Sequence, residues 1–143
     1  MEIIARRAGL AAALLLASAA TLSAQEGAAV EVMREYMEFS DYQAGVILPR
    51  QITQDIFENV TFIDTRSEER IAEGGVPGAT PIEWREVLGR IDEIPEDGKV
   101  ILYCDTGVLS AQAMFALRVA GRENVLVLQG GYANWLENAA YKP

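Results

Sequence analysis

The residue best suited to chemistry in this chain is Cys104, the only cysteine among 143 residues. The chain contains no histidine, which excludes Ser–His–Asp triads, Cys–His dyads and histidine-ligated metal sites. One cysteine cannot form an internal disulfide or a cysteine zinc cluster. Neither a metal nor another cofactor is expected. Reactivity at Cys104 would therefore be that of a lone thiolate, favoured by backbone N–H groups and the local field.

The residues around Cys104 predict a strand, a tight turn and a helix. The apolar run 100–103 (VILY) is typical of a strand buried on both faces, and Cys104 follows at its carboxyl end. Residues 105–107 turn the chain, and we expect a helix over 110–119 that ends at Gly121. This geometry would gather N–H groups around a sulfur that is open to solvent. The alternative is that Cys104 is an inert, buried apolar residue.

The overall composition fits one globular domain and excludes several kinds of partner. Apolar residues make up 50% of the chain, charged residues 23%, and the net charge is −9. Nucleic-acid binding is not expected because no basic face is present, and anionic lipid is also disfavoured. The longest apolar run, near the N-terminus, is too short for a membrane span, so stable membrane insertion is not expected.

The first residues, 1–24, are predicted to be a secretory signal peptide. Two adjacent arginines precede the apolar stretch 8–20, and small residues follow it. Cleavage is expected after Ala24, with Ala20 as the alternative, and the choice between Sec and twin-arginine export stays open. We expect a soluble exported protein, most simply a periplasmic one. An unpaired thiol in such an oxidising compartment either exchanges sulfur or is buried.

Further apolar runs predict an α/β domain with a central parallel sheet and helices on both faces. We expect an N-terminal helical extension over residues 25–45 and a single domain over residues 46–143. The other predicted strands are Val46–Leu48, Val60–Asp64 and Asn124–Leu128. The other predicted helical segments are Ala28–Phe39, Gln51–Phe57, a helix capped by Ser67 that runs through Ile71, Glu83–Ile91, and Tyr132–Asn138 with Trp135 packed inward.

Asp64 and Arg66 follow the end of a predicted strand, where α/β sheets gather functional groups. They can form a structural ion pair that holds the turn, or they can take part in catalysis. We favour the structural role for Arg66 and leave the role of Asp64 open.

The order of these elements resembles the single-domain rhodanese-like (sulfurtransferase) family. The resemblance extends from about Ile52 to Trp135 and includes the sequences FIDTR, GGVPGA, YC and GGYANW. It implies a parallel-sheet fold in which the active cysteine carries sulfane sulfur as a persulfide. Cys104 would be that carrier, and Asp64 and Arg66 would support it. The anion cradle implied by the resemblance consists of Asp105, Thr106, Gly107, Val108, Leu109 and Ser110.

The chain also departs from the family pattern. Gly75 replaces the histidine of the GHxPGA loop, and Arg70 replaces a glutamate in the helix after the strand. Asp105 and Leu109 stand where the active loop often has arginines. Phosphatase relatives need an arginine at the position of Ser110, so hydrolysis of phosphate esters is not expected.

Asp105 is expected to weaken the thiolate without abolishing it. Backbone donors at a helix start favour a thiolate by about 0.3–1 kcal/mol, and by up to about 2 kcal/mol when partly buried. A carboxylate roughly 7 Å away opposes it by about 0.6–1.2 kcal/mol at an effective dielectric of 40–80. Binding of an anionic donor such as thiosulfate should suffer more, which favours a neutral persulfide or a protein-bound donor.

Two functions follow as hypotheses. The first is a periplasmic sulfurtransferase that uses a small sulfane-sulfur donor or a thiol or persulfide protein. The alternative is a non-catalytic binding or regulatory module that contacts an exported partner through the loop 105–109 and the helix 28–39. Its motivation is the apolar pair Val108 and Leu109 at the loop tip. Redox sensing by Cys104 through a mixed disulfide is compatible with the first.

Overall fold

The computed structural model describes residues 25–41 and 43–143, so the predicted signal peptide lies outside the described residues. Contacts divide the chain into a first unit that ends at Ser40 and a second unit, Asp41–Pro143. Residues 25–39 of the first unit are helical and include the predicted helix 28–39. No helix within the described residues is long and apolar enough to cross a membrane. The predicted division into residues 25–45 and 46–143 stays a prediction.

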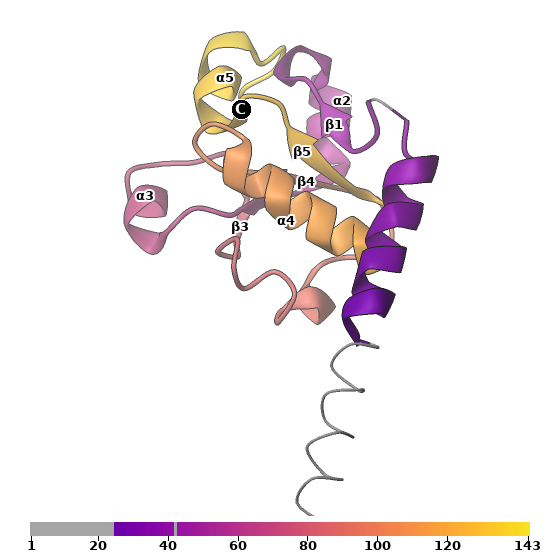
Figure 1. The fold of residues 1–143 in the computed structure, drawn as a ribbon. Helices are drawn as coiled ribbons and strands as arrows, with labels where there is room; N and C mark the ends of the chain where they lie inside the picture. The colour runs from indigo at the N-terminus through magenta and orange to yellow at the C-terminus, as the bar shows by residue number, and fades with distance from the viewer. Residues whose placement is uncertain (1–24, 42) are drawn as a thin grey trace, which may run out of the picture. The chain divides into compact units, whose positions relative to one another are not determined.

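The second unit is built on a five-stranded sheet in which every pair of neighbouring strands is parallel (Figure 1). The strands lie in the order β1-β5-β4-β2-β3. This confirms the predicted α/β fold. The edge strand β3 was not predicted because its two residues, a threonine and a proline, form no apolar run. The strands are β1 (Val46–Ile47), β2 (Val60–Asp64), β3 (Thr80–Pro81), β4 (Lys99–Tyr103) and β5 (Val125–Leu128).

Helices cover both faces of this sheet, as predicted. They are the 3-10 turns η1 (Pro49–Gln51) and η2 (Ile91–Glu93) and the helices α2 (Gln54–Glu58), α3 (Glu68–Ala72), α4 (Val108–Val119) and α5 (Gly131–Asn138). Ser67 caps α3 as expected, since its side chain accepts the N–H of Arg70. The Gly121 N–H donates to the Arg118 carbonyl one turn back, which ends α4 as expected.

The prediction that α4 begins at Ser110 is wrong, because the helix starts two residues earlier, at Val108. Gly107 has a φ of +88° and serves as the N-cap. This left-handed conformation turns the chain directly from the loop into the helix. The start of α4 therefore lies closer to Cys104 than the sequence indicates.

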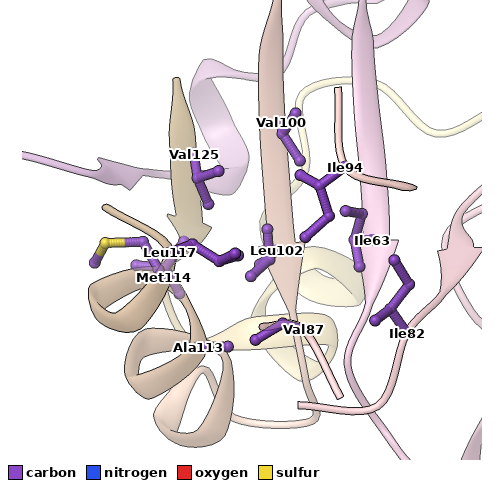
Figure 2. Packing of buried hydrophobic residues seen from close by; sticks show 11 residues of the cluster. Ile63, Ile82, Val87, Ile94, Val100, Leu102, Ala113, Met114, Leu117 and Val125 are labelled. Carbon is purple, nitrogen blue, oxygen red and sulfur yellow. The ribbon is translucent and has the colours of Figure 1, made fainter. Parts of the chain in front are cut away.

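The central strand β4 is buried on both faces by alternation of its side chains. Val100 and Leu102 belong to the core beneath α4, where Figure 2 shows them with Leu117 of that helix. Ile101 and Tyr103 belong to the second core, on the side of α2 and α5. Full burial of an aliphatic or aromatic side chain stabilises the fold by about 1.5–3 kcal/mol. Cys104 therefore follows the most firmly packed strand of the sheet.

The predicted helix over Glu83–Ile91 is wrong, since residues 84–90 form consecutive turns. The segment begins against the sheet, where the N–H of Trp84 donates to the Thr65 carbonyl. Its inward side chain is Val87, whereas Leu88, expected on the apolar side, is 51% exposed. Gly89 further weakens helix formation.

Candidate active site

Cys104 lies directly after β4, and its sulfur faces donors from the following loop. The Gly107 N–H donates to Sγ at 3.2 Å, and the Ser110 hydroxyl lies 3.5 Å from Sγ. We expected the sulfur of Cys104 to be open to solvent. That expectation is wrong, because Cys104 is only 3% exposed. Access comes through a pocket of about 430 Å³ whose lining includes Cys104.

Two opposing effects act on the thiol. Burial raises the pKa of Cys104, since a thiolate is poorly solvated there. Hydrogen bonds from the Ser110 hydroxyl and from the N–H groups of Ser110, Thr106 and Leu109 lower it. The lowering effects win, so the pKa of Cys104 lies below its ordinary value. The site therefore favours a thiolate without an imidazole base.

Ser110 is fully buried and can donate its single hydroxyl proton in two directions. Its oxygen lies 3.2 Å from the Gly107 carbonyl oxygen and 3.5 Å from Sγ of Cys104. A hydrogen bond to an ionised acceptor is the stronger of the two. Ionisation of the sulfur therefore draws the hydroxyl proton toward Sγ.

The first turn of α5 is hydrogen-bonded to the active loop, by which we mean residues 104–107. The Tyr132 N–H donates to the Cys104 carbonyl at 2.8 Å, and the Ala133 N–H donates to the Asp105 carbonyl at 3.1 Å. Gly131 has a φ of +62°, and a Cβ there would overlap the Cys104 carbonyl oxygen. Gly130 and Gly131, the glycines of the GGYANW sequence, thus let α5 approach the loop and fix the direction of its peptide groups.

Asp64 and Arg66 form a buried ion pair, and the structural role that we favoured for Arg66 stays a prediction. Arg66 donates from Nε to Oδ1 of Asp64 at 2.9 Å and from Nη2 to Oδ2 at 2.6 Å, and both side chains are 3% exposed. The Tyr103 hydroxyl donates to Oδ2 of Asp64 at 2.7 Å and accepts the Val76 N–H at 3.0 Å. Hydrogen bonding to Asp64 raises the pKa of Arg66, and burial raises the pKa of Tyr103.

Gly75 stands beside this buried network, which accounts for the missing histidine of the GHxPGA pattern. A Cβ at position 75 would lie 2.9 Å from the Tyr103 hydroxyl and 3.0 Å from both Arg66 Nη2 and Asp64 Oδ2. A larger side chain would have to displace these groups. In this chain the tyrosine hydroxyl occupies the space next to the ion pair.

The Asp105 carboxylate is not the uncompensated charge that the sequence suggested. Arg70 donates to it from Nε at 3.2 Å and from Nη2 at 3.0 Å, and Arg66 donates from Nη1 at 3.4 Å. Hydrogen bonding from Arg70, followed by its charge, lowers the pKa of Asp105. Sequence reasoning missed this pair because the two residues are 35 positions apart. One feature of the sequence could have indicated the pair: both Arg70 and Asp105 depart from the family pattern, and they do so with opposite charges.

The remaining residues of the predicted cradle have different surroundings. Thr106 and Leu109 line the pocket beside Cys104. Val108 is 62% exposed and Leu109 is 38% exposed. Trp84 and Arg85, which sequence reasoning did not place in the site, also line the pocket. Within residues 25–41 and 43–143, no three acidic, cysteine or histidine side chains are grouped as a metal site would require.

Known proteins match both the sequence and the fold. Residues 49–138 match the family model of the rhodanese-like domain. The chain is 37% identical over 78 residues to a sulfurtransferase of Allochromatium vinosum, which covers 54% of this chain and 73% of that protein. It is 44% identical over 43 residues to the probable adenylyltransferase/sulfurtransferase MoeZ of Mycobacterium tuberculosis, over 30% of this chain and 11% of MoeZ.

Among solved structures, the human single-domain sulfurtransferase superposes with a TM-score of 0.59 at 22% identity. The match covers 66% of this chain and 96% of the human protein, and it shows the same fold. The segment matched by the family model extends from η1 to the end of α5 and contains Cys104. The chain therefore belongs to the rhodanese-like family.

Proposed function

We propose that this protein is an exported sulfurtransferase in which Cys104 carries a sulfane sulfur as a persulfide. The observation that carries the proposal is the lowered pKa of a cysteine that lines a pocket and accepts the Gly107 N–H. Nucleophilic transfer by a thiol requires the thiolate form and access for the donor. Similarity to the sulfurtransferase of Allochromatium vinosum supports the same activity.

The transfer consists of two balanced displacements. The Cys104 thiolate attacks the outer sulfur of a donor R–S–SH, so a new S–S bond forms while the donor S–S bond breaks. The proton of the outer sulfur passes to the departing R–S⁻, which leaves as R–SH, and the enzyme holds Cys–S–S⁻. An acceptor R′–SH then takes the terminal sulfur as R′–S–SH, and the Cys104 thiolate returns. No external oxidant or reductant is consumed.

The active loop can stabilise the anion in both states. In the resting site the Gly107 N–H lies 3.2 Å from Sγ, and the Ser110 hydroxyl lies 3.5 Å from it. Donors fixed in place before the reaction need no reorganisation to stabilise the thiolate, and we expect N–H groups of the same loop to stabilise the charge on the outer sulfur. The packing of α5 behind the loop keeps these peptide groups in position.

Mass spectrometry of the intact protein tests the proposal directly. Incubation with a sulfane-sulfur donor should add one sulfur atom, and the site is unambiguous because Cys104 is the only cysteine. The matched variant Cys104→Ser should gain nothing. Absence of the adduct with several donors, in a protein whose Cys104 still reacts with iodoacetamide, would refute sulfur transfer.

Export to the periplasm is part of this proposal and rests on the pattern of residues 1–24. Expression of the full chain in a Gram-negative host should yield a processed periplasmic protein that begins at Gln25. An unprocessed protein in the cytoplasmic fraction would contradict export. Either result leaves the chemistry at Cys104 as a separate question.

A second function, that of a binding module, is favoured by the exposed side chains Val108 (62%) and Leu109 (38%). Adjacent apolar side chains exposed in the first turn of α4 suit contact with a protein partner. The variant Cys104→Ser separates the two functions. Loss of activity with unchanged partner capture would assign both roles, whereas an unchanged phenotype would favour the module alone.

A further inference from the structure

The pocket above Cys104 contains three arginines, and each is neutralised by carboxylates. Arg66 pairs with Asp64 and Asp105, Arg70 pairs with Asp105 and Glu73, and Arg85 pairs with Glu83. Each arginine thus has a carboxylate partner, and two of the four carboxylates, Asp105 and Glu83, line the pocket as well. The positive charge of the pocket lining is therefore largely matched by carboxylates next to it.

Asp105 differs from the other carboxylates because it contacts two of the arginines and also lines the pocket. Its two oxygens accept from Arg70 at 3.0 Å and 3.2 Å in a fork-to-fork arrangement. The same residue accepts from Arg66 at 3.4 Å. The Arg70–Asp105 pair also lines a second pocket of about 240 Å³, so it lies where two hollows of the surface meet.

We infer that Asp105 determines the class of sulfur donor, an inference that rests on the sulfur transfer proposed above. Asp105 accepts from Nη1 of Arg66 and from Nε and Nη2 of Arg70, so these N–H groups are not left for a donor anion. The other two donor nitrogens of Arg66 are hydrogen-bonded to Asp64 and Gly74. The site therefore accepts an alkyl persulfide, whose persulfide group carries at most one negative charge, over the thiosulfate dianion. Arg66 and Arg70 line the pocket, and Asp105 is the one carboxylate that contacts both of them there.

The variant Asp105→Asn removes the charge and keeps the shape of the side chain. It should fold, because the side chains of Arg70 and Asp105 are 47% and 41% exposed and exposed pairs add little stability. Both guanidinium groups would then face the pocket with one carboxylate fewer. Anionic reagents should therefore react faster with Cys104, whereas the rates of uncharged reagents should not rise for this reason.

The alkylating agents iodoacetate and iodoacetamide measure this selectivity without any sulfur transfer. They are similar in shape, one is an anion and the other is uncharged, and both react with the same thiolate. The ratio of their rates therefore cancels any change in the thiolate fraction of Cys104. Loss of a negative charge roughly 7 Å away, at an effective dielectric of 40–80, should raise this ratio about three- to eightfold.

Sulfur loading supplies the second measurement. The rate of persulfide formation from thiosulfate, divided by the rate from an alkyl persulfide, should rise in Asp105→Asn. Thiosulfate carries one negative charge more than an ionised alkyl persulfide, so this ratio should rise about three- to eightfold, as for iodoacetate against iodoacetamide. The rate from thiosulfate, compared with that of an uncharged reagent, should rise roughly eight- to sixtyfold. Adding Arg70→Gln to Asp105→Asn should remove most of the gain.

The control variant Glu58→Gln makes the same change in total charge on α2, outside the residues that line the pocket. An iodoacetate-to-iodoacetamide ratio in Asp105→Asn no higher than in Glu58→Gln would overturn the inference. A raised ratio with no sulfur loading from either donor would refute sulfur transfer instead, while charge control at Cys104 would stand. A raised ratio together with raised thiosulfate loading supports both.

Discussion

Replacing Gly131 with alanine should damage the active loop more than any ordinary glycine replacement. Gly131 has a φ of +62°, and a Cβ there would lie 2.6 Å from the Gly107 nitrogen and 2.7 Å from the Asp105 carbonyl carbon. Both are backbone atoms of the loop, so no flexible side chain can move aside. The loop or the start of α5 must shift, and the Tyr132 N–H bond to the Cys104 carbonyl would weaken.

The loss in the free energy of unfolding of Gly131→Ala has two parts. A left-handed conformation costs a residue with a Cβ about 1–2 kcal/mol. Forcing extra volume into a packed region adds about 1–3 kcal/mol. The sum for Gly131→Ala is about 2–5 kcal/mol, a large share of the ~5–15 kcal/mol by which a domain is typically stable. The second part should also reach the chemistry, because displaced N–H groups stabilise the Cys104 thiolate less and raise its pKa.

Gly98→Ala is the matched control, since Gly98 has a φ of +74° and a Cβ there meets nothing within 4 Å. Gly98→Ala should therefore lose only the free energy that the left-handed backbone conformation costs a residue with a Cβ. Urea unfolding should therefore show Gly131→Ala less stable than Gly98→Ala by about 1–3 kcal/mol. Iodoacetamide labelling against pH should show a raised Cys104 pKa only in Gly131→Ala. Equal stability and equal labelling in the two variants would refute the steric explanation of the glycine pair.

Three further outcomes are expected. Ser110→Ala removes a donor to the sulfur, so the pKa of Cys104 should rise and iodoacetamide labelling at neutral pH should slow. Tyr103→Phe leaves Asp64 and the Val76 N–H short of a buried partner, so urea unfolding should show a loss of about 1–3 kcal/mol. The pKa of folded Cys104 lies below its ordinary 9.0, so the unfolded chain binds more protons between the two values. Measured against Cys104→Ser, stability should therefore rise with pH toward 9.0, level off above it, and be lost as pH falls through the folded pKa.

The sequence was sufficient for the parts of the fold that are determined by continuous apolar runs. The strands Val60–Asp64 and 99–103 were predicted almost to the residue because each is short, apolar and buried on two sides. Their ends place Asp64 and Cys104 at the same edge of the sheet, since parallel neighbours end together. The prediction of the site's location followed from the single cysteine, the strand ends and the resemblance to the family.

The segment 83–91 shows where apolar spacing misleads. The spacing of Trp84, Val87, Leu88 and Ile91 fits one helix face, but spacing indicates only which side chains are apolar. The start of the segment is tied to the sheet by the Trp84 N–H, and the core takes Val87 and Ile94, which are each 2% exposed. Tertiary hydrogen bonds at one end and a glycine within the segment outweigh a weak local preference. The consequence matters for the site, because Trp84 and Arg85 line its pocket.

The charge at the site could not be judged from the loop sequence because its counter-ions come from α3. Asp105 follows Cys104 directly, and Arg70 lies 35 positions earlier, so only the fold brings them together. The two properties of the site consequently have separate origins. The thiolate is favoured by peptide groups and Ser110, whose positions depend on the approach of α5 to the loop. In the proposed sulfur transfer, the donor would be selected by side-chain charges on the pocket wall. Changes at Gly131 or Ser110 should therefore move the pKa of Cys104 and leave the ratio of anionic to uncharged reagents unchanged, whereas a change at Asp105 should move that ratio.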